Sequence, residues 1–162
     1  MSVARRIRRT AVALSVAAAT TAAGLSAAPA DAAIGPVSAR LSVAPNVQRY
    51  SVDVTGVIRM SQAEAQNLID NDYRVVWKLW GDDPVYNDLL FGPDPASITA
   101  TSRGLEFHGA RVTTGGVLDE DDSVFDDHDE LFARVSLVKG YVNGRPGPSV
   151  KSGDSNNVGG YY

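Results

Sequence analysis

Two stretches of the chain, 73–80 and 131–138, place an apolar residue at every second position. This period of two predicts β-strands with one face in a core, because a helix would repeat its apolar residues every three or four positions. The residues that share one face of each predicted strand are Tyr73, Val75, Trp77 and Leu79 in the first, and Leu131, Ala133, Val135 and Leu137 in the second. The chain is therefore expected to build its core from β-sheets.

Further strand signals lie on either side of these stretches. Apolar residues alternate in 37–43 and 50–54 around a Pro45-Asn46 turn, and Gly56 predicts a bulge or a bend after them. The other segments that are predicted as strands are 85–91, 97–101, 105–108, 111–117 and 149–152. Short strands separated by turn residues are typical of antiparallel sheets.

One segment has the pattern of a helix. Ser61 and Glu64 have the spacing of a capping box, in which the serine caps the first turn and the glutamate bonds back to it. Asn71 is predicted to end the helix in a left-handed conformation. The apolar residues on one stripe of this helix are Ala65, Leu68 and Ile69. A helix of about ten residues is not stable alone, so it is expected to lie against the sheets or to close one end of them.

These elements predict an all-β protein, an antiparallel β-sandwich of seven to eight strands with one short helix. A closed barrel is the alternative, because strand spacing does not decide whether the sheet edges meet. The sequence contains no internal repeat and no sign of a second folded domain.

The first 32 residues have the three regions of a secretory signal peptide. Arginines at 5, 6, 8 and 9 precede an apolar stretch at 11–25, and Ala30-Asp31-Ala32 has the A-x-A form of a cleavage site. The apolar stretch is too short for a transmembrane helix. We expect residues 1–32 to be removed and residues 33–162 to be a single secreted, extracellular domain without a transmembrane segment.

The charge and the cysteine content restrict the classes of partner. The full chain has a formal charge of −4 and no cysteine. The signal peptide carries four arginines and one aspartate, so its removal makes the domain still more acidic. Nucleic acid is therefore not an expected partner. The domain has no disulfide and no thiol chemistry, so its core, or a core with bound metal, must hold it together.

An acidic segment, residues 119–130, is the clearest candidate for a functional site. Eight of its twelve residues are aspartate or glutamate, and no lysine or arginine lies between Arg111 and Arg134. Solvent and salt can offset such charge, and so can a divalent cation. Calcium binds six to eight oxygen ligands from a loop that can wrap around it, and Asp119, Asp121, Asp127 and Asp129 are spaced to supply them. An EF-hand is excluded because Val124 occupies the position that needs glycine.

The spacing D-x-D-x5-D, formed by Asp119, Asp121 and Asp127, resembles the third calcium loop of C2-type β-sandwich domains. In that family an earlier acidic turn supplies further ligands, and Gly81-Asp82-Asp83-Pro84-Val85-Tyr86 is similar to it, with Asp88 close behind. The resemblance covers these two loops and about half of the domain. The predicted calcium ligands are Asp82, Asp83, Asp88, Asp119, Asp121, Asp127 and Asp129. The chain also resembles small exported proteins of actinobacterial type. This resemblance rests on the Ala-rich signal peptide and on the segments 79–84 and 118–121.

Three classes of function remain open, and the pattern favours binding over catalysis. The first is a secreted binding module that uses calcium and contacts an extracellular protein, a glycan or a cell-surface ligand. The second is a protein-interaction or inhibitor domain without metal, for which Trp80, Tyr86 and Tyr161-Tyr162 are candidate contacts. Trp80 is nevertheless predicted as a strand residue, and the Tyr161-Tyr162 tail as disordered.

The third class is a small hydrolase that uses paired carboxylates. The only histidines are His108 and His128, and neither an H-E-x-x-H nor a G-x-S-x-G motif is present. His108 is predicted as a half-exposed strand residue and His128 as a solvated member of the acidic segment. The sequence therefore identifies no catalytic residue.

Overall fold

The computed structural model describes residues 34–82, 86–119 and 129–162. The predicted signal peptide and its cleavage site lie outside these ranges. The elements are β1 (Val37–Asn46), β2 (Arg49–Ile58), α1 (Gln62–Asp70), β3 (Tyr73–Gly81), β4 (Asp88–Pro95), β5 (Ser97–Thr101), β6 (Gly104–Thr113), α2 (Gly115–Leu118), β7 (Asp129–Lys139), β8 (Tyr141–Val142), β9 (Arg145–Pro146), β10 (Ser149–Asp154) and β11 (Val158–Gly160).

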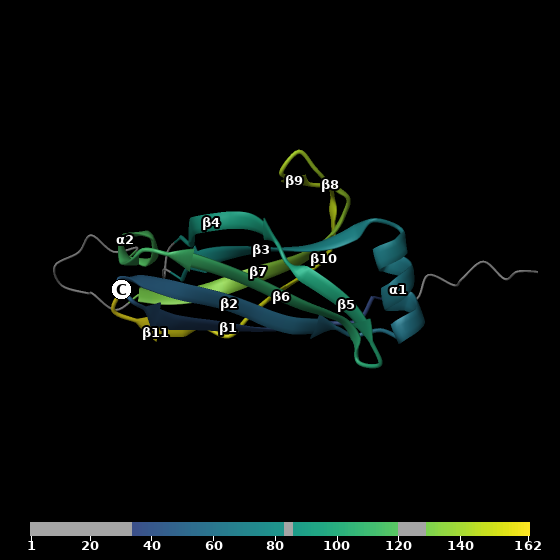
Figure 1. The fold of residues 1–162 in the computed structure, drawn as a ribbon, viewed down its shortest axis with the longest axis horizontal. Helices are drawn as coiled ribbons and strands as arrows, with labels where there is room; N and C mark the ends of the chain where they lie inside the picture. Colours follow the sequence, from purple (N-terminus) through teal and green to yellow (C-terminus); the bar gives the residue numbers. More distant parts are fainter. Residues whose placement is uncertain (1–33, 83–85, 120–128) are drawn as a thin grey trace, which may run out of the picture. The chain divides into compact units, whose positions relative to one another are not determined.

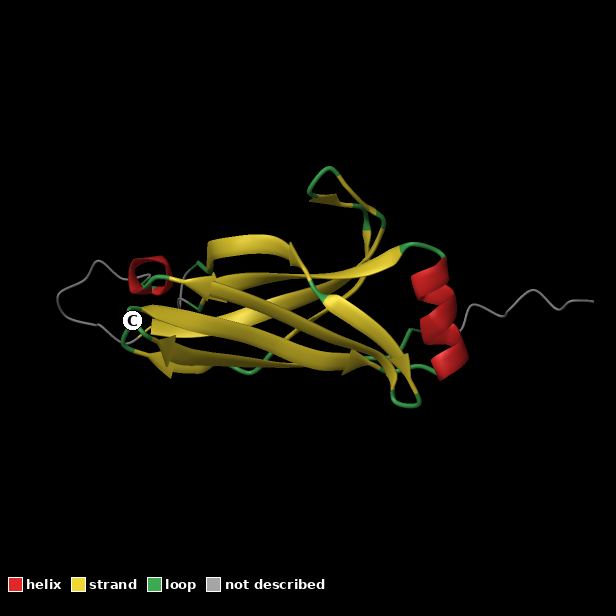
Figure 2. Ribbon diagram, in the orientation of Figure 1, coloured by secondary structure: helices red, strands yellow, loops and turns green. Residues whose placement is uncertain are grey.

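The strands form two main antiparallel sheets (Figures 1 and 2). One has the order β1-β2-β6-β5, and the other has the order β10-β7-β3-β4 with β11 added to β7. A two-stranded hairpin, β8-β9, projects from this core (Figure 1). Within the described ranges the two main sheets share no ladder, so they form a sandwich rather than a closed barrel. The predicted all-β class is confirmed, and eight of the described strands have five or more residues.

One face of each alternating stretch lines the core. Val75, Trp77 and Leu79 of β3 are fully buried, and Tyr73 is partly buried at the edge of the same cluster. The alternating residues of β7 are also fully buried: Leu131, Ala133, Val135 and Leu137. Burial of one such large apolar side chain contributes roughly 1.5–3 kcal/mol. The paired strands β3 and β7 therefore form the apolar centre of one sheet.

Two predicted strands form a single strand in the structure. The sequence predicts separate strands at 105–108 and 111–117, but β6 continues through Gly109 and ends at Thr113. Continuous pairing with β2 supports the strand across Gly109. A Cβ atom there would lie 2.3 Å from Nε1 of Trp77, so this glycine makes room for the indole and does not end the strand. A second, four-residue helix, α2, replaces the end of the predicted second segment.

The prediction of a bulge at Gly56 is wrong. Gly56 pairs in regular register with Ala39 on one side and with Phe107 on the other. A Cβ atom at this position would lie 2.0 Å from the Ser38 carbonyl oxygen and 2.4 Å from Cζ of Phe107. The glycine is thus required by close packing within a regular strand. The segment predicted at 85–91 also differs, because β4 begins at Asp88 and extends to Pro95.

Helix α1 begins with the predicted capping box and lies at one end of the sandwich (Figure 1). Ser61 Oγ accepts a bond from the Glu64 N–H at 3.2 Å, and Glu64 Oε2 accepts one from the Ser61 N–H at 2.7 Å. The left-handed residue after the helix is Asp72, with φ +62°, and not Asn71 as predicted. Asn71 instead donates from its side chain to the Asn67 carbonyl. No described helix is long and apolar enough to cross a membrane.

The C-terminal segment is ordered, contrary to the prediction of a disordered tail. Residues 158–160 form β11 against the start of β7. The Tyr162 ring packs edge-on against Tyr50 of the other sheet, with 5.3 Å between ring centroids. Pairing with β7 supplies the backbone bonds and Tyr50 supplies the apolar contact that hold this segment.

Candidate functional site

The two acidic segments singled out in the sequence begin and end at the same end of the sandwich. Strand β3 pairs antiparallel with β7 so that Gly81 lies opposite Leu131, and Gly81 also lies opposite Asp88 in β4. The Asp82 N–H donates to the Glu130 carbonyl at 2.7 Å. Asp82 and Asp88 are close in sequence, and Glu130 is distant from both. All three therefore lie on or next to adjacent, hydrogen-bonded strands.

Asp82 is held on both its main chain and its side chain. Its backbone bond to Glu130 fixes the position where the chain leaves β3. Its Oδ2 accepts a bond from Nδ2 of Asn157 at 2.5 Å. Asp82 is half-buried, whereas Asp88 at the start of β4 is exposed. A charge-assisted bond of this kind orients a carboxylate and leaves its second oxygen for another ligand.

Asp119 reaches the same end through helix α2. The Asp119 N–H donates to the Gly115 carbonyl at 2.9 Å, and Asp119 is exposed to solvent. A Cβ atom at Gly115 would lie 3.0 Å from the carbonyl carbon of Tyr162 and 3.4 Å from the Tyr50 ring. The first residue of α2, the helix that leads into the acidic segment, thus lies beside Tyr162.

Asp129 is the buried member of the predicted ligand set. Only 2% of its surface is exposed, and it lies opposite Gly160 at the first position of β7. The pKa of Tyr162 is raised chiefly by burial, then by the negative charge of Asp129, and then by Tyr50. The end of the acidic segment is therefore anchored in the protein, in contrast to the exposed Asp119.

The structure thus brings four predicted ligands to one end of the sandwich: Asp82, Asp88, Asp119 and Asp129. Asp83, Asp121 and Asp127 lie outside the described residues, and so does His128. Within the described ranges, no group of three acidic or histidine side chains is close enough to hold a metal ion. The chain entering the acidic segment is the short helix α2 rather than the strand that the sequence suggested.

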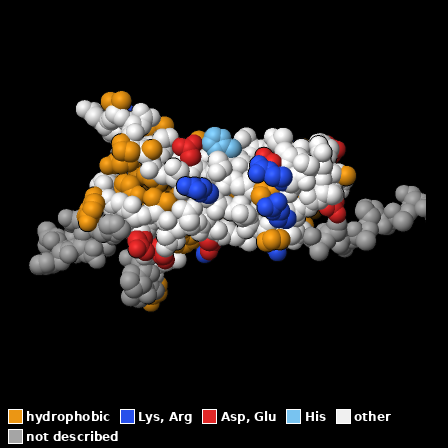
Figure 3. All heavy atoms as spheres, turned by 90° about the horizontal axis from the view of Figure 1, so that it is seen from below, with side chains coloured by type: hydrophobic (Ala, Val, Ile, Leu, Met, Phe, Trp, Pro, Cys, Tyr) orange, Lys and Arg blue, Asp and Glu red, His pale blue; other side chains and the backbone are white. Residues whose placement is uncertain are grey.

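The aromatic candidates differ in their surroundings. Trp80 is half-buried on the outer face of β3, with the Arg134 guanidinium 5.8 Å and the Lys78 ammonium 5.9 Å from its ring. Tyr86 is 79% exposed and Tyr161 is 73% exposed. Figure 3 shows hydrophobic side chains gathered toward the end of the sandwich that carries the C-terminus. Trp80 is therefore part of a cation–aromatic cluster, whereas most of the surface of each of the two tyrosines is exposed.

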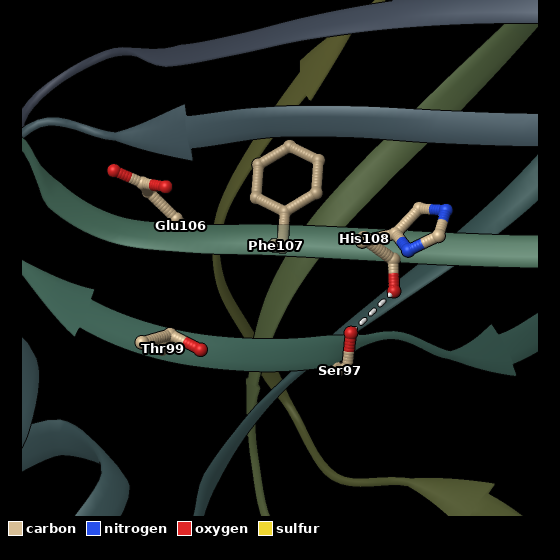
Figure 4. A pocket seen from close by; sticks show the side chains of 5 residues that line it. All are labelled: Ser97, Thr99, Glu106, Phe107 and His108. Carbon is tan, nitrogen blue, oxygen red and sulfur yellow. Dashed lines mark hydrogen bonds between the residues drawn. The ribbon is translucent and has the colours of Figure 1, made fainter.

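A second candidate, which the sequence reading missed, lies on the outer face of the four-stranded sheet (Figure 4). His108 is exposed, and its Nε2 lies 3.1 Å from Oδ1 of Asp53 on the neighbouring strand β2. A hollow beside it is lined by Ser97, Thr99, Glu106, Phe107 and His108. The only signal in the sequence was a polar residue at alternate positions of 97–99 and 106–108, which is equally typical of a solvated strand face.

The fold and these two sites define an all-β, antiparallel sandwich protein with an acidic end and a polar hollow. Comparison of the chain with known protein families, with curated proteins and with solved structures finds no match.

Proposed function

We propose that this protein is an exported binding module that takes up calcium at the acidic end of the sandwich. The observation that supports this most is the bond from the Asp82 N–H to the Glu130 carbonyl at 2.7 Å. It joins the 81–88 corner to the end of the acidic segment, which lie 48 residues apart in sequence. Had these two segments been at opposite ends of the sandwich, no single cation could contact both.

The chemistry of the described carboxylates suits a hard cation. Calcium takes oxygen ligands at 2.3–2.6 Å, and carboxylate oxygens are among the ligands that it prefers. One oxygen of Asp82 is bonded to Asn157, and within the described ranges its other oxygen is left for a ligand. Without a cation, the carboxylates of this end repel one another, because the segment 112–133 contains no lysine or arginine. A bound cation would remove that repulsion.

Thermal unfolding in EDTA and in about 10 mM calcium tests this proposal. Extracellular calcium modules have dissociation constants of about 10⁻⁴–10⁻³ M, so calcium should raise the free energy of unfolding by roughly 1–3 kcal/mol. Asp82→Asn should reduce this increment. Asp70→Asn in α1 is the matched control, because it removes the same charge at the opposite end (Figure 1). Melting curves that are identical in EDTA and in calcium would reject the proposal.

An interaction domain without metal is a second candidate. It is favoured by the exposed side chains Val47, Tyr86 and Tyr161, which are 90%, 79% and 73% exposed. Exposed aromatic residues commonly anchor protein partners. If calcium leaves the melting curve unchanged, we expect partner binding to depend on Tyr86 and Tyr161, and their replacement by serine should abolish it.

A further inference from the structure

A hollow of about 230 Å³ lies between β5 and β6 on the outer face of the four-stranded sheet (Figure 4). The ladder places Ser97 opposite His108 and Thr99 opposite Glu106. Because alternate residues of a strand share one face, these four polar side chains surround the hollow. Phe107, the intervening residue of β6, packs in the core and lies beneath it.

The hollow exists because its two longest side chains are drawn apart. Glu106 Oε1 accepts bonds from Thr101 Oγ1 at 2.6 Å and from Arg103 Nε at 2.8 Å, which hold it toward the β5-β6 turn. His108 is held in the other direction, toward Asp53 of β2. In Figure 4 the two side chains diverge from the strand that carries them. Ser97 and Thr99 on the opposite strand are too short to fill the space left between them.

The groups that face this space are hydrogen-bond acceptors. Bonds from Arg103 and from Thr101 lower the pKa of Glu106, so its carboxyl is ionised. Both bonds use Oε1, and no described residue bonds to Oε2. His108 Nε2 faces a carboxylate, which only accepts, so Nε2 is the donor of this bond. In the neutral imidazole, Nδ1 then has the lone pair and is an acceptor.

The Ser97 hydroxyl adds a third acceptor. Its proton is donated to the His108 carbonyl at 3.0 Å, which leaves the lone pairs of Oγ for a ligand. Apart from His108, the charged groups that line the hollow or bond to its lining are Glu106, Asp53 and Arg103, which are two negative charges and one positive charge. A ligand for this hollow needs several donors and no negative charge.

We propose that the hollow binds a primary ammonium group. An ammonium carries three N–H donors, which match the three acceptors Glu106 Oε2, His108 Nδ1 and Ser97 Oγ. Its positive charge matches the excess of negative charge around the hollow. A hydroxyl group brings one donor, and a carboxylate or phosphate would be repelled. The hollow is smaller than the 300–1,000 Å³ typical of sites for drug-sized ligands, so it takes a single group rather than an extended molecule. Two sources carry this chemistry, a lysine side chain and an amino sugar.

Titrations of the ¹⁵N-labelled protein, followed by amide chemical shifts, test the proposal. n-Butylammonium represents the lysine side chain, with n-butanol as its neutral counterpart. Glucosamine represents the amino sugar, with N-acetylglucosamine as its neutral counterpart. We expect saturable shifts at residues 97–99 and 106–108 with one or both of the amines and not with the neutral compounds. Whichever amine binds more tightly identifies the source.

Three variants distinguish amine binding at this hollow from nonspecific electrostatic attraction of the amine to an acidic protein. Glu106→Gln should weaken amine binding about tenfold or more, since it removes a charge-assisted bond. Arg103→Gln should strengthen binding, because the carboxylate loses a competing cation while Thr101 Oγ1 still bonds to its Oε1 and keeps it in place. Asp70→Asn, with the same charge change on α1, should leave the affinity unchanged. Equal shifts with the neutral compounds, or equal losses in the Glu106 and Asp70 variants, would overturn the proposal.

Discussion

The side-chain amide of Asn156 bonds to both backbone polar groups of Leu41. Its Oδ1 accepts from the Leu41 N–H at 3.0 Å, and its Nδ2 donates to the Leu41 carbonyl at 3.4 Å. Leu41 lies on β1, an edge strand of one sheet, and Asn156 follows β10 of the other. One amide thus replaces a strand partner at this edge and joins the two sheets. Covering edge groups also protects a sheet from pairing with another chain.

Replacement of Asn156 tests this role. Asn156→Ala leaves the N–H and the carbonyl of a buried residue without their partner, so we expect a loss of about 1–3 kcal/mol in the free energy of unfolding. Urea denaturation measures it. The exposed residue Asn87 provides the control, because Asn87→Ala should change stability by less than about 0.5 kcal/mol. Equal stability of both variants would contradict the bridging role.

Alanine substitutions at Gly56 and Gly116 compare the stability effect of a methyl group at a closely packed position and at an open one. Gly56→Ala places a methyl group 2.0 Å from the Ser38 carbonyl oxygen, so the strands must move apart at a cost of about 1–3 kcal/mol. Gly116 in α2 has no atom within 4 Å of an added Cβ, and Gly116→Ala should be neutral or slightly stabilising. Thermal unfolding of the two variants compares them. A stable Gly56 variant would mean that the strand is not closely packed there.

Glu64 predicts a specific dependence of stability on pH. Its pKa is lowered by bonds from the backbone and the side chain of Ser61. Because the folded-state pKa is below the ordinary value, the contribution of Glu64 is present above that value and is lost as the pH falls through the lowered one. The wild type should therefore be more stable than Glu64→Gln at pH 7 and lose this advantage in acid. Denaturation of both proteins across this pH range gives the measurement, and a constant difference would contradict the assignment.

Tyr162 connects the acidic end to a spectroscopic signal. Burial and the charge of Asp129 raise its pKa, so its phenolate absorbance should appear above the usual pH range. Because the folded-state pKa is raised, the contribution of the protonated Tyr162 to the free energy of unfolding is present below the ordinary tyrosine pKa. This contribution is lost as the pH rises through the raised pKa. Asp129→Asn should lower the pKa of Tyr162, and Tyr162→Phe should remove the late-titrating component from the absorbance curve.

Calcium provides a further use of the same titration. A cation bound at the acidic end would offset the charge of Asp129, so the pKa of Tyr162 should fall when calcium is added. Magnesium at the same ionic strength controls for screening. A pKa of Tyr162 that is the same in calcium and in EDTA would place any bound calcium away from Asp129.

The sequence by itself determined the class of fold, the alternating faces of the long strands and the start of helix α1. These features depend on local chemistry, such as the alternation in 131–138 and the Ser61-Glu64 capping box, which act between residues close in sequence. The acidic end was also predictable in part, because the turn at 81–84 and the segment 119–130 could be read as separate loops.

Only the tertiary structure decided which distant residues meet. The bond between Asp82 and Glu130, the Asn156 bridge to Leu41 and the hollow between Glu106 and His108 each depend on strand register and sheet packing. The role of Gly56 was predicted wrongly for the same reason, since a glycine that makes room for another strand is identical in sequence to one that bends the chain. Contacts across sheets depend on the relative placement of whole strands, and no short stretch of sequence specifies that placement.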